Sequence, residues 1–188
     1  MLNLYFSSLF LLLYSFIFNK RFNINIIQSY LITLFSIIFS LIFFSKFLNL
    51  KLGVYVVNII FLLSFFLILL KSKISFGKKD LRIFIIHSII FLLICLYCNN
   101  FFLYKYDEFS EYGIIPKLIF FYDKLPLEIY EVAGKGSPFK INIISVYYYY
   151  FLKFTGNQFS EVNLYILHNI FIIIIILNIF YYLKGFKE

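Results

Sequence analysis

The sequence contains one alanine, no tryptophan, three prolines and two cysteines among its 188 residues. It also lacks a phosphate-binding P-loop, the glycine set of dinucleotide-binding folds, a zinc-ligand pair and a G-x-S-x-G nucleophile motif. These absences remove support for ATP-driven transport and for the nucleotide chemistry of soluble enzymes. The two cysteines, Cys95 and Cys98, lie inside an apolar run, whereas a redox or metal site needs exposed thiols and further ligands. We therefore expect two buried helix cysteines.

Apolar residues dominate the chain instead. Hydrophobic residues make up 63% of it, 28 residues are phenylalanine, and the mean hydropathy is +0.92. A soluble domain is only about half apolar. Because each membrane-spanning helix needs about 20 apolar residues, the length allows one membrane domain of about five spans. The composition therefore predicts an all-α, multi-pass membrane protein that is a single polytopic membrane domain over residues 1–188.

Five apolar runs are long enough to cross a membrane, and irregular backbone is excluded from lipid, so all five are expected to be helical. The predicted spans are residues 2–18, 26–45, 52–70, 83–104 and 164–183. The first run has no basic residue before it and no small-residue cleavage site after it, which favours a retained helix over a signal peptide.

Basic residues indicate the orientation of these spans. Residues 71–82 contain five basic residues against one acid, Asp80, which is the strongest cytoplasmic signal in the chain. Alternation then places the C-terminus in the cytoplasm, and the N-terminus and residues 105–163 outside. The net charge of +8 does not indicate nucleic-acid binding, because the basic residues lie in short loops between spans rather than on one face.

The long outer segment, residues 105–163, is expected to contain short interfacial helices. Pro116 suits the first turn of a helix over residues 116–123. Residues 141–154 are apolar but too few to span comfortably, and they include four consecutive tyrosines, at positions 147 to 150. Tyrosine prefers the level of the lipid headgroups, where its ring is buried and its hydroxyl is hydrated. We therefore expect an interfacial or re-entrant helix there.

Acidic residues gather at the start of this outer segment. In a helical turn, Asp107, Glu108 and Glu111 would share one side, and clustered carboxylates raise at least one pKa. They could act as a general base, bind a divalent cation or pair with Lys117, while Gly113 would permit close approach of a substrate. A simpler interpretation is that these acids only solvate an outer loop.

Two histidines lie within the predicted spans. His87 is near the cytoplasmic start of the fourth span, and His168 is near the outer start of the fifth. Single helix histidines are usually packed or hydrogen-bonded, but ionisable groups inside a membrane are often functional. His168 stays a candidate for substrate binding because it lies on the acidic side.

The residues from Tyr106 to Lys117 read YDEFSEYGIIPK. This string resembles an outer-loop signature of bacterial multi-span membrane proteins related to the GT-C glycosyltransferases, which reads aromatic-D-E-F-S-H-W-G-x-x-x-K. Downstream, the resemblance continues through Gly136-Ser137-Pro138, the tyrosine-rich stretch and Gly156 to Glu161. It covers roughly residues 101–169. Glu111 and Tyr112 stand where the pattern has histidine and tryptophan.

The resemblance implies transfer of a sugar from a polyprenyl-phosphate donor at the outer face of the cell (inner) membrane. Asp107 or Glu108 would be the catalytic carboxylate, and Lys117 would stabilise the departing phosphate. Further substrate-binding candidates are Ser110, Glu111, Tyr112, Gly113 and His168. Family members are longer, so the resemblance also implies that this chain matches their N-terminal part and that a second membrane chain could supply the remaining spans.

Two other classes of function stay open. The chain could be a flippase or transporter component that binds lipid-linked sugars without chemistry, although transporters usually place ionisable groups in mid-membrane. It could also be a non-catalytic membrane subunit or a truncated, non-functional frame. In every case membrane lipid is an expected partner and nucleic acid is not.

Overall fold

The computed structural model describes residues 2–71, 77–99, 114–125, 143–154, 156 and 159–185. Within these ranges the secondary structure is entirely helical, as the sequence predicted. The long helices are α1 (Leu2–Phe22), α2 (Ile26–Ser45), α3 (Leu50–Lys71), α4 (Lys78–Cys98) and α8 (Glu161–Gly185), and the short ones are α5 (Ile114–Tyr122) and α7 (Ile143–Phe154).

Five of these helices are long and apolar enough to cross a membrane: Leu2–Phe22, Ile26–Ser45, Leu50–Leu70, Asp80–Cys98 and Glu161–Tyr181. Each corresponds to one of the predicted spans. A 20-residue helix is about 30 Å long, which matches the hydrocarbon core of a bilayer. The chain is therefore a helical multi-span membrane protein, and its short helices α5 and α7 belong to the segment expected to contain them.

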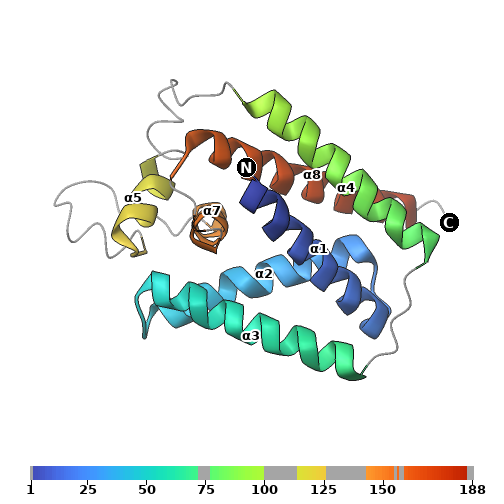
Figure 1. The fold of residues 1–188 in the computed structure, drawn as a ribbon, viewed down its shortest axis with the longest axis horizontal. Helices are drawn as coiled ribbons and strands as arrows, with labels where there is room; N and C mark the ends of the chain where they lie inside the picture. Colours follow the sequence, from blue (N-terminus) through green and yellow to red (C-terminus); the bar gives the residue numbers. More distant parts are fainter. Residues whose placement is uncertain are drawn as a thin grey trace.

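Local hydrogen bonds fix where two of the long helices begin. The Asn25 side chain accepts a hydrogen bond from the Ile27 amide at 2.8 Å and caps α2. The Asp80 carboxylate accepts one from the Gly77 amide at 2.8 Å and caps α4. Each side chain satisfies a backbone donor that a helix start leaves unpaired. Both caps lie at the same end of the bundle (Figure 1).

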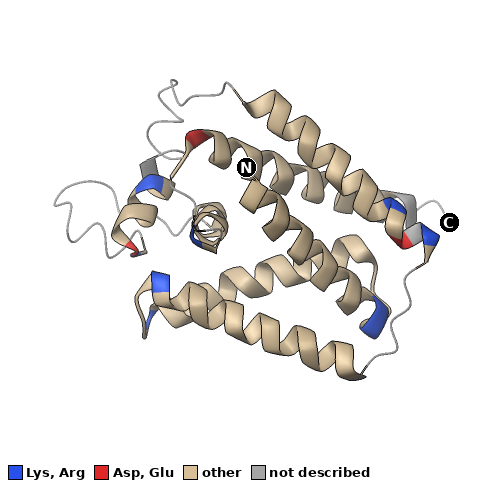
Figure 2. Ribbon diagram, in the orientation of Figure 1, with Lys and Arg blue, Asp and Glu red and all other residues tan. Residues whose placement is uncertain are grey.

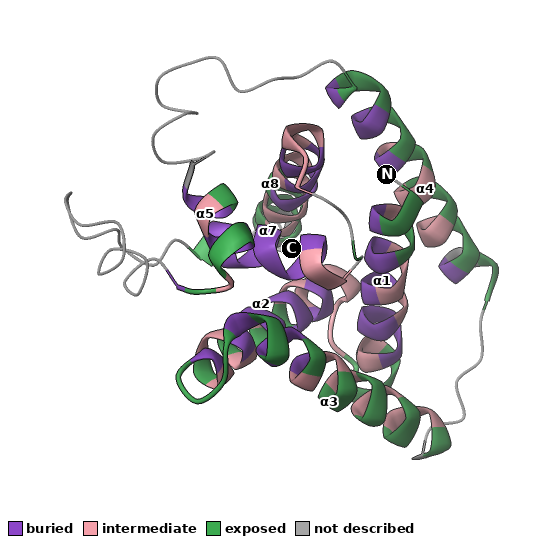
Figure 3. Ribbon diagram, turned by 60° about the vertical axis from the view of Figure 1, so that its left-hand side comes forward, coloured by how far each residue is buried: buried purple, intermediate pink, exposed green. Residues whose placement is uncertain are grey.

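Helices α1 and α2 form the most extensive helix pair, and α3 packs on both of them. Helix α4 contacts α1 and α8, on the side of the bundle away from α3 (Figure 1). Burial follows this arrangement, since half of the α1 span is buried inside the protein and only 17% of the α3 span. The exposed, apolar outer faces of α3 and α4 (Figure 3) are therefore suited to lipid.

Helix α7 runs across the bundle rather than along it. Figure 1 looks down its axis, while the five long helices lie across the view. It contacts α1, α2, α3, α5 and α8. Its 12 residues would cover about 18 Å, well short of the hydrocarbon thickness. It is a short helix inserted among the spans near one end, which we call the α7 end.

The four tyrosines of α7 differ from the expectation in one respect. Their hydroxyls were expected to be hydrated, but the side chains are at most 5% exposed. Each hydroxyl instead binds a protein group: the Leu167 carbonyl, the His168 ring, the Asp123 carboxylate and the Asn58 side chain, for positions 147 to 150 in order. Because neighbouring side chains on a helix point about 100° apart, four consecutive tyrosines reach four different partners.

Polar contacts also join the long helices inside the apolar band. The Tyr5 hydroxyl lies 2.8 Å from Ser88 Oγ on α4, and the Tyr14 hydroxyl lies 2.9 Å from Ser64 Oγ on α3. Such contacts contribute where no hydrophobic effect drives helices together. The expectation for the cysteines is confirmed, because Cys95 and Cys98 are both free and buried in α4.

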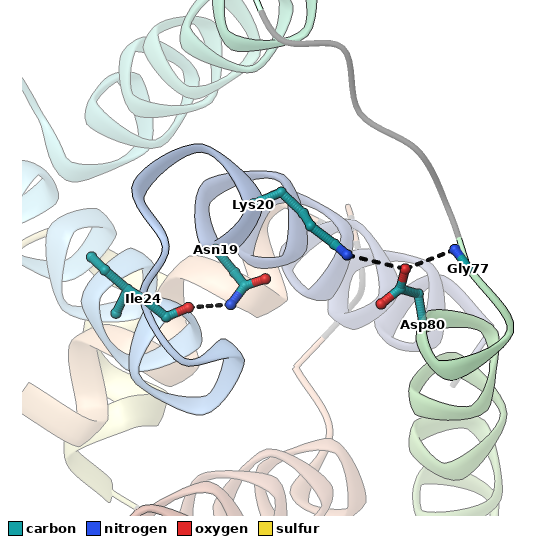
Figure 4. Close-up of polar contacts among 5 residues, drawn as sticks. All are labelled: Asn19, Lys20, Ile24, Gly77 and Asp80. Atoms are coloured by element: carbon teal, nitrogen blue, oxygen red, sulfur yellow. Dashed lines mark hydrogen bonds and ion pairs between the residues drawn. The ribbon is translucent and has the colours of Figure 1, made fainter.

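Charged residues lie at the two ends of the bundle and leave the middle of the spans apolar (Figure 2). At the end away from α7, Lys20 Nζ lies 3.3 Å from an Asp80 carboxylate oxygen, which joins α1 to α4 (Figure 4). The Asn19 side chain also donates to the Ile24 carbonyl in the connection between α1 and α2 (Figure 4). We call this the Lys20 end.

Candidate functional site

The acidic motif lies outside the residues that the structure describes. Its predicted site residues are Asp107, Glu108, Ser110, Glu111, Tyr112 and Gly113. The described chain resumes at Ile114, the first residue of α5, directly after Gly113. The end of the motif is thus joined to a helix that packs on α7. The described part of the candidate site comprises α5, α7 and the start of α8.

Helix α5 confirms the predicted short helix, and it begins two residues earlier than expected. Pro116 is its third residue and lies within the first turn, where its missing amide hydrogen leaves no gap. Ile115, Ile119 and Phe120 face inward and are buried. Lys117 is exposed on the other face. The helix therefore holds the predicted phosphate-binding lysine at the surface of the α7 end.

Lys117 lies over an aromatic surface made by α5 and the residues before α8. Its Nζ is 5.9 Å from the centre of the Phe159 ring. The Phe159 ring in turn packs on Phe120 and Phe121, with ring centres 5.7 and 6.0 Å apart. Tilted aromatic pairs and a cation over a ring face are both attractive arrangements. These rings fix the region from which the Lys117 ammonium projects.

Asp123 ends α5 and connects it to α3. Its φ of 53° is in the left-handed region, and its amide donates to the Ile119 carbonyl at 3.0 Å, as in a helix C-cap. Its own carbonyl accepts a hydrogen bond from the Leu50 amide at 3.1 Å, at the start of α3. Aspartate tolerates this conformation better than most residues. The backbone at Asp123 therefore links two elements.

The Asp123 carboxylate links these elements to α7. One oxygen is 2.7 Å from Lys153 Nζ and accepts a hydrogen bond from the Tyr149 hydroxyl at 2.7 Å. Tyr149 and Lys153 are four residues apart on α7, so both side chains lie on one face. The two charged side chains are 19% and 26% exposed. Lys153 Nζ also lies 4.2 Å from the centre of the Phe120 ring. We call Asp123, Tyr149 and Lys153 the Asp123 cluster.

Burial governs the chemistry of the Tyr149 hydroxyl. Removal from water raises the pKa of Tyr149 well above its usual range, and the hydrogen bond to Asp123 raises the pKa further. The phenol therefore stays protonated and acts as a hydrogen-bond donor. The Asp123 cluster thus combines a carboxylate with a lysine that balances its charge and a phenol that donates a hydrogen bond to it.

No protein-family model, curated protein or solved structure matches this chain.

His168, the other predicted site residue that the structure describes, is half-buried on α8. Its Nδ1 lies 2.7 Å from the Tyr148 hydroxyl. The neighbouring Asn169 side chain donates to the Tyr165 carbonyl at 2.8 Å and lies 3.6 Å from Cys98 Sγ. Among the described residues, His168 and Lys117 share no hydrogen bond. His168 contacts α7 directly through Tyr148, whereas Lys117 lies on α5, which packs on α7.

The described ranges bring together no group of three His, Cys, Asp or Glu side chains that could hold a metal ion. The predicted divalent cation was assigned to the acidic motif, which these ranges do not include. Within the described residues, the Asp123 cluster uses a lysine ammonium where a metal site would have a cation. The Asp123 cluster can therefore fix α5 in place, and α5 presents a cationic, aromatic surface around Lys117.

The Asp123 cluster was not predicted from the sequence. Asp123 was expected only as the end of the short helix over residues 116–123, and the tyrosines at the level of the lipid headgroups. The only available signal was the spacing of Tyr149 and Lys153, which puts a hydroxyl and a cation on one helical face. Their shared partner lies 26 residues before Tyr149, and no local pattern specifies such a contact.

Proposed function

We propose that this protein is a GT-C-like membrane glycosyltransferase that transfers a sugar from a polyprenyl-phosphate donor at the α7 end. One observation carries the proposal: α5 begins directly after the acidic motif and exposes Lys117 at the α7 end. A lipid-linked donor lies in the membrane with its phosphate at the surface. A carboxylate and a lysine held at that level are the groups that such a transfer requires.

In this proposal the acidic motif supplies the base. Asp107 or Glu108 would remove the proton from the acceptor hydroxyl, and Lys117 would stabilise the negative charge on the departing lipid phosphate. Ser110, Glu111, Tyr112, Gly113 and His168 would contact the substrates. Lys153 is engaged by Asp123, so it would hold α5 in position rather than bind the phosphate.

The proposal also includes an orientation and partners. The α7 end would face outward. The Lys20 end, where α4 begins, would face the cytoplasm of a bacterial cell, and so would the C-terminus. The basic residues of positions 71–82 support this orientation through the positive-inside rule. The lipid-linked sugar, membrane lipid and a second membrane chain with further spans are the proposed partners.

The test measures transfer of a labelled sugar from a polyprenyl-phosphate donor in membranes that contain this chain, with expression levels matched. Asp107→Asn and Glu108→Gln keep the size of the side chain and remove its charge. Loss of the general base should lower transfer by about a hundredfold or more in one of them. Lys117→Met should also lower transfer. Glu131→Gln is the matched control, because Glu131 lies outside the motif.

Two results would contradict the proposal. Full transfer in both Asp107→Asn and Glu108→Gln would mean that the acidic block is a solvated loop. Absence of transfer by the unaltered chain, together with saturable binding of the lipid-linked sugar, would favour a non-catalytic flippase or transporter component.

A further inference from the structure

The bundle contains a cavity of about 140 Å³ between α1, α2, α4 and α8. Its wall is almost entirely aliphatic, with eleven Ile or Leu side chains and Phe91 among the 14 lining residues. An apolar cavity of similar size, about 150 Å³, binds benzene in another protein. This cavity therefore has room for a short stretch of hydrocarbon chain.

The cavity opens toward the lipid. Ile86 on α4 and Leu177 on α8 line it and are 54% and 43% exposed. Leu12 and Ile94 also line it and are at most 7% exposed. The cavity thus runs from a mouth formed by α4 and α8 to a buried floor. A chain can enter sideways from the bilayer without passing through water.

The Tyr30 side chain offers a hydrogen-bond donor in the cavity wall. Tyr30 lines the cavity and is 6% exposed, and within the described part of the chain its hydroxyl has no hydrogen bond. Tyr30 lies in the second turn of α2, close to the Lys20 end. A ligand that accepts a hydrogen bond at this depth would satisfy it.

His87 is the other polar residue in the wall. The Ser8 hydroxyl donates to the Tyr5 carbonyl at 2.8 Å, so it can only accept at its 3.2 Å contact with His87 Nε2. The Nε2 atom of His87 therefore carries the hydrogen, and Nδ1 of the neutral ring is an acceptor. The cavity wall thus combines the Tyr30 phenol with the His87 ring, which Ser8 of α1 holds in position.

Exposed basic residues lie at the Lys20 end of the bundle, on the helices whose ends line this part of the cavity. Ile83 lines the cavity directly after Arg82, which is exposed in α4. Arg21 is exposed in the last turn of α1, and Lys78 is exposed in the first turn of α4. Among the described residues the acid at this end is Asp80, which is paired with Lys20. A ligand whose headgroup lies here is therefore favoured if it is anionic.

We infer that this cavity is a binding site for one anionic glycerophospholipid from the leaflet at the Lys20 end. One acyl chain enters between α4 and α8, an ester oxygen accepts the Tyr30 hydrogen bond, and the headgroup lies near Arg21 and Arg82. The site is separate from the proposed sugar-transfer site, which is at the α7 end. Its test uses no sugar transfer, so either proposal can fail alone.

The experiment measures binding of phosphatidylglycerol to the purified full chain, with phosphatidylcholine of the same acyl chains as the comparison. Native mass spectrometry in detergent counts the retained lipids over a titration. One saturable phosphatidylglycerol should bind, at least about fivefold more tightly than phosphatidylcholine. Arg82→Gln should weaken phosphatidylglycerol binding about fivefold, because one basic residue near a membrane surface contributes roughly a fivefold change in affinity.

Two variants separate the cavity from the lipid-facing surface. Ile90→Trp fills the cavity and should abolish saturable binding, whereas Ile89→Trp places the same ring on an exposed, neighbouring position that does not line the cavity. Tyr30→Phe keeps the shape of the floor and should weaken binding about fivefold, the value of one neutral hydrogen bond. Because Tyr30→Phe is nearly isosteric, it tests the site even if Ile90→Trp does not fold.

Wild-type binding in Tyr30→Phe together with wild-type binding in any folded Ile90→Trp protein would overturn the proposal. Equal affinity for phosphatidylcholine would overturn the anionic assignment. Preferential retention of polyprenyl phosphate over phosphatidylglycerol would overturn the phospholipid assignment.

Discussion

Among the described residues, each end of the bundle contains one lysine–aspartate pair, and the two pairs differ in what surrounds them. At the α7 end the Lys153–Asp123 distance is 2.7 Å, and the side chains are 19% and 26% exposed. At the Lys20 end the Lys20–Asp80 distance is 3.3 Å, and the side chains are 40% and 12% exposed. The first lysine is therefore shielded from water, and the second is more open to it.

The two pairs differ because each aspartate has a different second hydrogen-bond donor. Asp80 accepts a further hydrogen bond from the Gly77 amide, three residues away, so it is first of all a helix cap. Asp123 accepts one from Tyr149, which lies on another helix. The same residue types thus make a helix cap that also pairs with α1 at one end, and a junction of α3, α5 and α7 at the other. The structural setting, not the residue type, determines the expected energy.

The two ends are proposed to face opposite sides of the membrane, and chemical labelling of single cysteines tests this with an all-or-none result. Single cysteines at Ser75 and Ser137, with Cys95 and Cys98 replaced by serine, would be exposed to a membrane-impermeant reagent in intact cells. The cysteine at 137 should be labelled, and the one at 75 should be labelled only after permeabilisation. The reverse pattern would invert the proposed orientation.

The largest stability effect is expected at the α7 end. Asp123→Ala removes the acceptor of Tyr149 and leaves the Lys153 ammonium poorly hydrated, which should cost about 2 to 3 kcal/mol, between surface and fully buried pairs. The measurement is the free energy of unfolding from a denaturant titration in mixed micelles. Asp80→Ala is the matched control and should cost about 1 kcal/mol through its cap. Equal losses would remove the distinction between the two ends.

Loss of the Tyr149 hydroxyl tests the junction without removing a charge. Tyr149→Phe should lower the free energy of unfolding by about 1.5 to 2 kcal/mol, because one buried hydrogen bond to a carboxylate is lost while the ring stays packed. Tyr122→Phe, at a position that is 52% exposed, should change the same quantity little. If the two variants have the same stability, the hydrogen bond to Asp123 contributes nothing measurable.

The smallest effect is expected for the lysine at the other end. Lys20→Met keeps the aliphatic stem and removes the ion pair with Asp80, and it should cost at most about 0.5 kcal/mol. This contribution should weaken in high salt, because the Lys20 side chain is 40% exposed and exposed charges are screened. A loss above about 2 kcal/mol that does not depend on salt would show that this pair is as integrated as the Asp123 cluster.

The sequence predicted the fold more completely than the candidate site. Five spans, their order and the short helix that contains Pro116 are all present. For the site, the structure describes Lys117 and His168 and gives their neighbours, while the acidic motif stays a prediction. The Asp123 cluster was missed because hydrophobic periodicity indicates which residues are apolar, and gives no information about which polar groups meet across helices.

The sequence by itself determined that this chain is helical and crosses the membrane several times, because the thickness of the hydrocarbon core fixes the length of each apolar run and lipid forces every backbone group into a helix. Only the tertiary structure decided that α7 lies buried across the bundle, with its tyrosines bonded to residues as far as 92 positions away. The physical reason is that a tyrosine is equally suited to the lipid headgroups and to a buried hydrogen bond. The packing of the helices around α7 determines which of these two environments it occupies.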